Sequence, residues 1–140
     1  MPIIQGIRKH PLDSNKNVRI GVAFPLDEVN LFSGTETFKD QVKHNLINVL
    51  LTERGERVYE PHFGVGLRNL IFEPNIDTNA LNDAINQQIN LYIPQIELID
   101  TNVEFQSNEH KLFITISYRF LLDGTDDAIQ LKFNNNGINL

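Results

Sequence analysis

Residues 50–72 read Leu-Leu-Thr-Glu-Arg-Gly-Glu-Arg-Val-Tyr-Glu-Pro-His-Phe-Gly-Val-Gly-Leu-Arg-Asn-Leu-Ile-Phe, and the rest of the chain is organised around this stretch. It opens on the end of an apolar helical run, which we expect Gly55 to close because glycine adopts the left-handed conformation without a Cβ clash. Tyr59, Pro61 and Phe63 then place rigid, largely apolar groups in a connecting segment, where polar residues are usual. We therefore expect this loop to pack against the domain. After Gly64 and Gly66, the apolar spacing over residues 67–72 predicts one or two helical turns.

Two amphipathic helices flank this stretch. The first is expected to begin near Thr35, whose hydroxyl can cap the opening turn, and it has apolar residues at spacings of three and four: Phe38, Val42, Leu46, Val49 and Leu50. The second is expected over residues 78–93, with Asp77 as its cap and Pro94 as its end. Its apolar stripe consists of Leu81, Ala84, Ile85, Ile89 and Tyr92.

After Pro94 the apolar period changes from that of a helix to that of strands. Ile99, Val103 and Phe105 indicate a first strand, although Leu98 beside Ile99 leaves its register open. Residues 112–121 alternate clearly and predict a second strand, and a third follows the Asp123-Gly124 turn. The sequence predicts an α+β fold in which two helices pack on a small antiparallel sheet of about three C-terminal strands.

The N-terminal part is expected to be an extended arm. Residues 18–24 alternate and predict a short extra strand there, which Pro25 ends. We expect three regions: an arm with a short strand over residues 1–34, one α+β domain over residues 35–134, and a polar tail over residues 135–140.

Composition excludes several classes of function. The net charge of −6 is spread along the chain, which argues against binding nucleic acid through phosphate neutralisation. The chain has no cysteine, and no apolar run approaches the ~20 residues of a membrane span. The four histidines have no ligand-like spacing, so no metal site is expected, and the two glycines of residues 64–66 lack the third glycine of a dinucleotide loop. We expect no cofactor.

Carboxylates near aromatic residues raise the hypothesis that the protein is a glycosidase. Glu53, Glu56, Glu60 and Glu73 lie in or beside the central stretch, and a glycosidase needs two carboxylates on opposite sides of a sugar bond. No spacing forces two of them to converge, and Glu56 beside Arg57 is explained by an ion pair or a cap. We therefore expect no enzyme.

The ordered combination of Leu51-Thr52, Gly55-Glu56-Arg57, Pro61, Phe63-Gly64, Leu70 and Phe72-Glu73 resembles the baseplate wedge proteins of contractile-tailed bacteriophages. These are the sheath initiators, with counterparts in type VI secretion baseplates, and some carry a lysozyme-like label. The resemblance covers roughly residues 36–134 and continues to the closing segment of residues 126–133. Where the family tends to carry Glu-Pro-Arg after the second long helix, this chain has Ile93-Pro94-Gln95, so the proline is kept and both charges are lost.

The resemblance implies a structural component of a contractile-tail baseplate in the virion, assembled in the host cytoplasm, that links the wedge to the tail sheath and seeds sheath assembly by strand pairing. It implies the tail sheath protein and other baseplate wedge proteins as partners, and tube or hub proteins as further candidates, with no membrane and no nucleic acid. The alternatives are a peptidoglycan-cleaving enzyme and an adaptor subunit of another multiprotein machine.

Two sets of residues are the candidate sites. The family motif and wedge contact comprises Gly55, Glu56, Arg57, Tyr59, Pro61, Phe63, Gly64 and Pro94. Within it, Arg57 either staples the loop to its own domain or helps to present a rigid patch to a wedge partner. The last predicted strand has no expected element after it, and an open edge offers unpaired backbone groups to another chain. The predicted sheath-docking edge is therefore Ala128, Ile129, Gln130, Leu131, Lys132 and Phe133.

Overall fold

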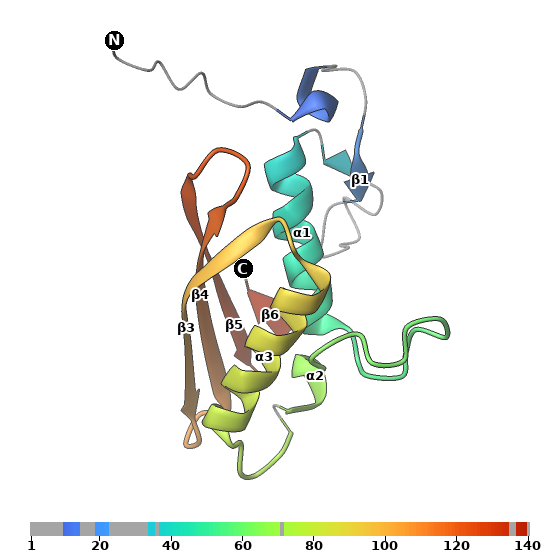
Figure 1. The fold of residues 1–140 in the computed structure, drawn as a ribbon. Coiled ribbons are helices and arrows are strands. Elements are labelled where there is room, and N and C mark those ends of the chain that lie inside the picture. The colour runs from blue at the N-terminus through green and yellow to red at the C-terminus, as the bar shows by residue number, and fades with distance from the viewer. Residues whose placement is uncertain are drawn as a thin grey trace.

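The computed structural model describes residues 10–14, 19–22, 34–35, 37–70, 72–134 and 137–139, and it confirms the α+β fold (Figure 1). Its helices are α1 (Phe38–Leu51), α2 (Leu67–Leu70) and α3 (Thr78–Tyr92), preceded by a 3-10 turn at Pro11–Ser14. The main sheet is an antiparallel meander of β3 (Ile96–Gln106), β4 (Lys111–Phe120), β5 (Asp126–Asn134) and β6 (Gly137–Asn139). A separate pair of short strands joins β1 (Gly21–Val22) to β2 (Gly34–Thr35).

The cap of helix α1 lies two residues later than Thr35, the predicted cap. Thr35 pairs with Gly21 in the small sheet, and its hydroxyl donates to Gln41 instead. Thr37 is the cap, because its extended backbone lets its side chain accept a hydrogen bond from the Asp40 amide at 3.2 Å. The prediction was wrong because either threonine can cap in isolation, whereas strand pairing occupies the first.

The end of α1 also differs from the prediction. The helix ends at Leu51, and Thr52 closes it by donating its amide and its hydroxyl to the Asn48 carbonyl. Gly55 does adopt a positive φ of 86°, but it does so inside the following loop. Its left-handed conformation shapes that loop and does not cap the helix.

Helix α3 agrees with the sequence pattern. It runs from Thr78 to Tyr92, and the Asp77 carboxylate accepts from the amides of Asn79 and Ala80 at its start. Leu81, Ile85 and Ile89 are buried on the predicted stripe. Together with α1, α3 covers one face of the sheet, and no helix of the described residues covers the opposite face (Figure 1).

The sheet supplies the other half of the core. From β4, Leu112, Ile114, Ile116, Tyr118 and Phe120 are buried, and from β5, Ile129, Leu131 and Phe133 join them. Burial of this kind contributes roughly 25 cal/mol per Å² of apolar surface. No helix among the described residues is long and apolar enough to cross a membrane.

A β-bulge settles the open register of the first long strand. Leu98 pairs with Tyr118 and Asp100 pairs with Ser117, so Ile99 is an extra residue between them. As a result Leu98 turns toward the core while Ile99 is 51% exposed. Val103 and Phe105 pack against the core, whereas the inserted residue places Ile99 on the other face of the sheet.

A strand follows β5, contrary to the expected polar tail over residues 135–140. β6 pairs with the end of β5 at Lys132, Phe133 and Asn134. Residues 135, 136 and 140 lie outside the described residues. β5 is therefore an inner strand over its last residues, and the premise that nothing covers it was wrong there.

Most of the predicted N-terminal arm lies outside the described residues, including position 18 and positions 23–24 of its predicted strand. Two of its segments contact the domain. Asp13 accepts from the Phe38 amide at 2.7 Å, at the start of α1, and the His10 ring stacks on Phe38 with centroids 4.0 Å apart. Of the described residues 19–22 of the predicted strand, only Gly21 and Val22 form a strand, β1, which pairs with β2 outside the main sheet.

The turn between β4 and β5 is tied to α1 by a charged contact. Lys39 contacts Asp123 at 2.5 Å and donates to the Thr125 hydroxyl at 2.7 Å. Hydrogen bonds from Lys39 and from Thr125 lower the pKa of Asp123 to about 2. Since Asp123 stays ionised to low pH, this link between helix and sheet persists under mildly acidic conditions.

Candidate functional site

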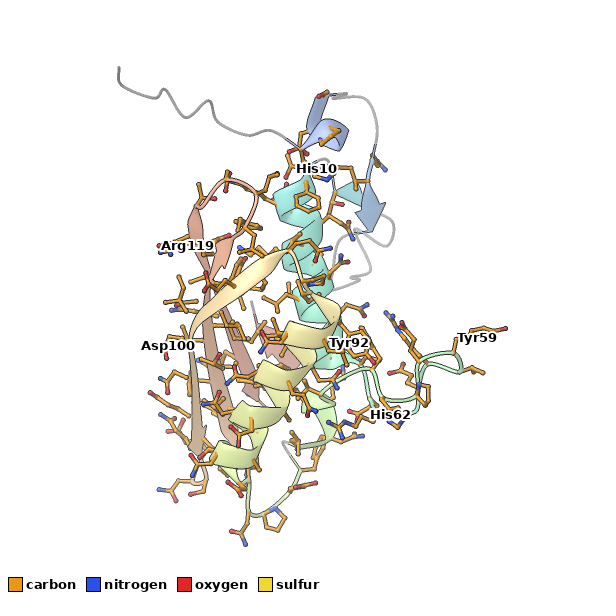
Figure 2. All side chains as sticks on the ribbon, viewed as in Figure 1. His10, Tyr59, His62, Tyr92, Asp100 and Arg119 are labelled. Carbon is orange, nitrogen blue, oxygen red and sulfur yellow. The ribbon has the colours of Figure 1, made fainter. Side chains whose placement is uncertain are left out.

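The segment of residues 53–63, here called the protruding loop, extends from the body of the domain with Tyr59 at its tip (Figure 2). Tyr59 is 98% exposed and Val58 is 87% exposed, whereas Phe63 at the base is 5% exposed. The expectation that the loop packs down therefore holds for its base and is wrong for its tip. Monomeric proteins have little reason to expose two adjacent large apolar side chains this fully.

Backbone hydrogen bonds hold the loop in shape. The Gly55 amide donates to the Pro61 carbonyl at 2.9 Å, which closes the loop at its neck. Glu56 accepts from the Glu53 amide through its carboxylate, while its own amide donates to the Glu53 carbonyl. These reciprocal bonds make Glu56 a local cap. The tip is thus presented by a preformed turn.

Arg57 braces the loop from within. Its guanidinium lies over the Phe63 ring, 3.7 Å from the ring centroid, and it contacts Glu60 at 3.2 Å. Both partners belong to the protruding loop. Arg57 therefore links Glu60 to the buried Phe63 ring at the base of the loop. Its role as a domain staple or in a wedge contact stays a prediction.

The base of the loop is clamped by Gln88, which the sequence analysis missed. Gln88 is 4% exposed, accepts from the Gly64 amide at 2.8 Å and donates to the His62 carbonyl at 2.9 Å. It lies three residues after Ile85, on the apolar stripe of α3. A polar side chain on a buried helix face needs a hydrogen-bond partner. A glutamine on the apolar stripe of α3 was therefore the sequence signal that could have predicted this clamp.

Gly64 approaches the end of α1 too closely for any side chain. Its φ is 105°, and a Cβ there would lie 2.1 Å from the Thr52 carbonyl oxygen. The next residue, Val65, donates its amide to Val49 at 3.0 Å. The chain therefore leaves the loop along the end of α1, and only glycine fits at the crossing.

A hollow of about 250 Å³ lies under the loop, lined by Asn45, Asn48, Val49, Arg57, Glu60, Phe63, Tyr92 and Ile93. The Tyr92 ring meets Phe63 edge to face, with centroids 4.8 Å apart. Pro94 comes two residues after Tyr92 and is exposed. The hollow brings Arg57, Glu60 and Phe63 of the loop beside Tyr92 and Ile93 at the end of α3, and a wedge contact that includes Pro94 stays a prediction.

Two of the three loop carboxylates make structural contacts. Glu56 caps the loop and Glu60 pairs with Arg57, while Glu53 has one buried oxygen that accepts no hydrogen bond among the described residues. Only Glu60 lines the hollow. The described residues contain no group of three or more histidine, cysteine or acidic residues placed to hold a metal ion.

The predicted docking edge on β5 has two sides that the structure distinguishes. The Phe120 amide donates to Thr125 across the turn, so the even-numbered residues of β4 direct their backbone groups at β5. By alternation, the backbone groups of Ile129, Leu131 and Phe133 point to β4, and those of Ala128, Gln130 and Lys132 point away.

Two of the three outward-pointing residues of β5 already have partners. Lys132 pairs with β6, and the Ala128 amide donates to the Asp127 carboxylate at 2.8 Å. Of the six predicted residues, only Gln130 keeps an outward amide with no protein partner in the described part of the chain.

Known proteins are similar to this chain in sequence or in structure. A protein of Enterobacteria phage T4, the baseplate wedge protein gp25, is 26% identical over 93 residues, which cover 65% of this chain and 70% of that protein. A candidate tail lysozyme from Geobacter sulfurreducens has a similar structure, with a TM-score of 0.62 and 25% identity over 73% of this chain and 95% of that one. A chain in the type VI secretion baseplate complex shares the fold, with a TM-score of 0.57 and 13% identity over 67% of this chain and 90% of that one.

The family model named baseplate wedge protein gp25 matches residues 36–125. The match spans the protruding loop, its clamp on α3 and the strands β3 and β4 of the meander. It also agrees with the resemblance carried by Gly55-Glu56-Arg57 and Phe63-Gly64. On this evidence, the chain belongs to the baseplate wedge protein gp25 family.

Proposed function

We propose that this protein is a structural subunit of a contractile-tail baseplate in the virion, and that its protruding loop binds another wedge protein. Membership in the family supports the structural baseplate role. The observation that carries the contact is the pair Val58 and Tyr59, each more than 85% exposed on a loop with internal bracing. The wedge-contact region then comprises the tip, Arg57 and the exposed Pro94.

The loop has the physical features of an interface anchor. Large aromatic side chains that enter a partner's pocket carry much of the energy at protein interfaces. A loop already held by the Gly55 to Pro61 bond and by Arg57 loses less conformational entropy on binding than a free segment would. The loop therefore suits insertion into an apolar pocket of a partner.

The loop contact is tested by replacing Val58 and Tyr59 with serine. We expect stability to change by no more than about 0.5 kcal/mol, because both side chains are exposed. Binding to the wedge protein of the same particle, measured by co-purification and calorimetry, should weaken by about 30-fold or more. Phe72→Ser is the matched control, since Phe72 is 78% exposed outside the loop and its loss should leave binding intact. Equal binding by all variants would refute the loop contact.

The seeding of the sheath by strand pairing remains part of the proposal. The open backbone groups of β5 before Lys132 would pair with an extended arm of the tail sheath protein, and tube or hub proteins are further candidate partners. A net gain of ~0.5 to 1.5 kcal/mol per hydrogen bond makes one such pairing weak. Repetition around a ring of subunits would supply the strength.

Proline and alanine at position 130 separate docking from folding. Gln130→Pro removes an amide that points away from β4, so the domain should fold with a melting temperature close to that of Gln130→Ala. Sheath assembly on the purified baseplate, followed by electron microscopy, should fail with proline and proceed with alanine. Normal assembly with the proline variant would show that β5 does not seed the sheath.

We propose no catalytic role. The lysozyme name of one structural relative describes that protein, and in this chain the loop carboxylates make capping and pairing contacts. An inactive preparation on purified cell wall is the expected result. Turnover that Glu56→Gln or Glu60→Gln abolishes would instead favour the enzymatic alternative.

A further inference from the structure

We propose that the free edge of β3, together with the groove between β3 and α3, binds an extended segment of a partner protein that carries basic residues at alternate positions. This site is separate from the protruding loop and from β5. It does not depend on either contact, so its test can fail while theirs succeed.

β3 offers the longer free edge of the sheet. It has 11 residues and pairs only with β4 among the described residues. The Leu121 amide donates to the Gln95 carbonyl at 3.1 Å. The backbone groups of Gln95 therefore point toward β4, and this sets the direction of the backbone groups along β3. Backbone groups alternate in direction along the strand, with Ile99 as the extra residue of the bulge. The outward backbone N–H and C=O groups, which point away from β4, belong to Leu98, Thr101, Val103 and Phe105. An added strand would find hydrogen-bonding groups there at regular intervals beyond the bulge.

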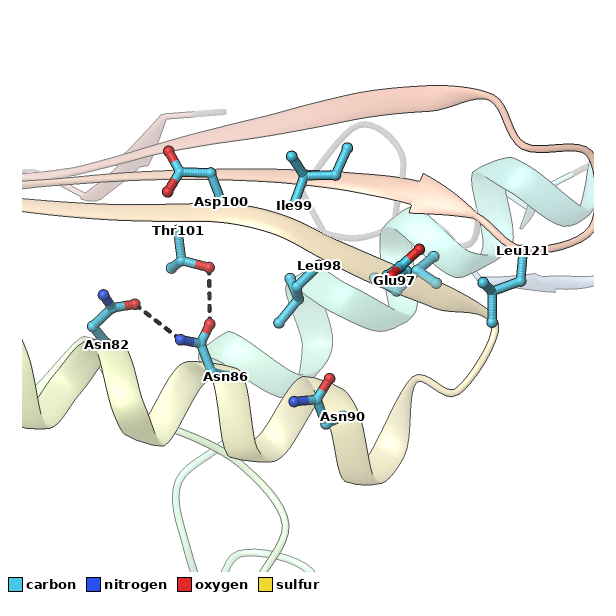
Figure 3. Close-up of a pocket in the computed structure, with 10 residues that line it drawn as sticks. Asn82, Asn86, Asn90, Glu97, Leu98, Ile99, Asp100, Thr101 and Leu121 are labelled. Atoms are coloured by element: carbon cyan, nitrogen blue, oxygen red, sulfur yellow. Dashed lines mark hydrogen bonds between the residues drawn. The ribbon is translucent and has the colours of Figure 1, made fainter.

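The groove beside this edge has a volume of about 700 Å³ and runs along three asparagines spaced one helical turn apart: Asn82, Asn86 and Asn90. Thr101 donates to Asn86 at 2.9 Å, and Asn86 donates to Asn82 at 3.4 Å, as Figure 3 shows. The Asn90 amide has no partner within the described part of the chain. These side chains form a wall of donors and acceptors that suits polar side chains of an added strand, whose inward residues would point toward α3.

The opposite side of the edge is acidic. Glu97, Asp100 and Glu104 are exposed. Glu97 lies opposite Arg119 in the strand pair and Glu104 accepts from Asn102 at 3.0 Å, but none of the three is within ion-pair distance of a cation among the described residues. Figure 3 shows Asp100 and Ile99 turned away from α3, because the bulge sends both to the outer face. The outward residues of an added strand would lie beside these carboxylates. Charge complementarity therefore selects lysine or arginine at those positions.

The same charges disfavour a second copy of this chain. Two β3 edges paired with each other would bring carboxylates together, and like charges opposite one another are destabilising. The occupant is therefore a basic, alternating segment of a different protein.

The test uses a synthetic peptide of alternating threonine and lysine, about ten residues long so that it spans β3. Titration into isotope-labelled protein should shift the NMR signals of the outward amides of β3 and of the side-chain amides of Asn82, Asn86 and Asn90. Added salt should weaken binding. A threonine and glutamate peptide should not bind. Equal binding of both peptides, or shifts confined to the protruding loop or β5, would overturn the proposal.

Two kinds of variant locate the site. Asp100→Asn and Glu104→Gln keep the fold and should each weaken binding of the lysine peptide about two- to five-fold. Val103→Pro removes an outward amide and should abolish binding that Val103→Ala retains. If the proline variant does not fold, the two charge variants decide, and unchanged affinity in both would overturn the proposal. Self-association of the free protein through β3, seen by sedimentation, would also overturn it.

Discussion

Gly64→Ala is expected to destabilise the domain by about 3 to 5 kcal/mol, a large share of the 5–15 kcal/mol of a typical domain. Two penalties combine at this position. The φ of 105° is strained for any residue with a Cβ, and the added methyl would lie 2.1 Å from the Thr52 carbonyl oxygen. That oxygen belongs to the backbone at the end of α1, so it can move only if the helix end moves. Thermal unfolding should show a fall of roughly 10 to 20 °C.

Gly55→Ala is the matched control for this result. Gly55 also has a positive φ, of 86°, but a Cβ there would meet no atom within 4 Å. Its cost should be only the conformational strain, about 1 to 2 kcal/mol. Equal destabilisation by the two substitutions would show that the contact with Thr52 is not the source of the effect.

Gln88→Met is expected to cost about 2 to 4 kcal/mol, because it leaves the buried Gly64 amide and the part-buried His62 carbonyl without their partners. Methionine preserves the approximate shape of the side chain, so lost packing contributes little. Amide hydrogen exchange should also become faster at Gly64. That measurement reports the base of the loop directly, beside the melting temperature.

Gln87→Met tests whether the effect belongs to the clamp. Gln87 is the neighbouring residue on the same helix and is exposed. Its replacement should change stability by no more than about 0.5 kcal/mol. If Gln88→Met were as mild as this control, the two hydrogen bonds would not hold the loop, and the preformed tip would need another explanation.

Much of the secondary structure could be predicted because it follows from local periodicity. The stripe of Leu81, Ile85 and Ile89 predicted α3 together with its cap Asp77, and the alternation over residues 112–121 predicted β4. These patterns work because a helix or strand that buries one face must repeat its apolar residues with its own period. The family was also readable, since its motif lies within one continuous stretch.

The sequence by itself determined the α+β class, the two long helices, the alternating strands and the requirement for glycine around residues 55–66. Tertiary structure alone decided that Gln88 clamps the loop, that Tyr59 faces solvent while Phe63 is buried, and that a bulge places Ile99 on the outer face of β3. Tertiary structure likewise covered the end of β5 with β6. The physical reason is that periodicity acts between near neighbours in the chain, whereas these features depend on hydrogen bonds and close contacts between segments up to 26 residues apart, as Gln88 and His62 are.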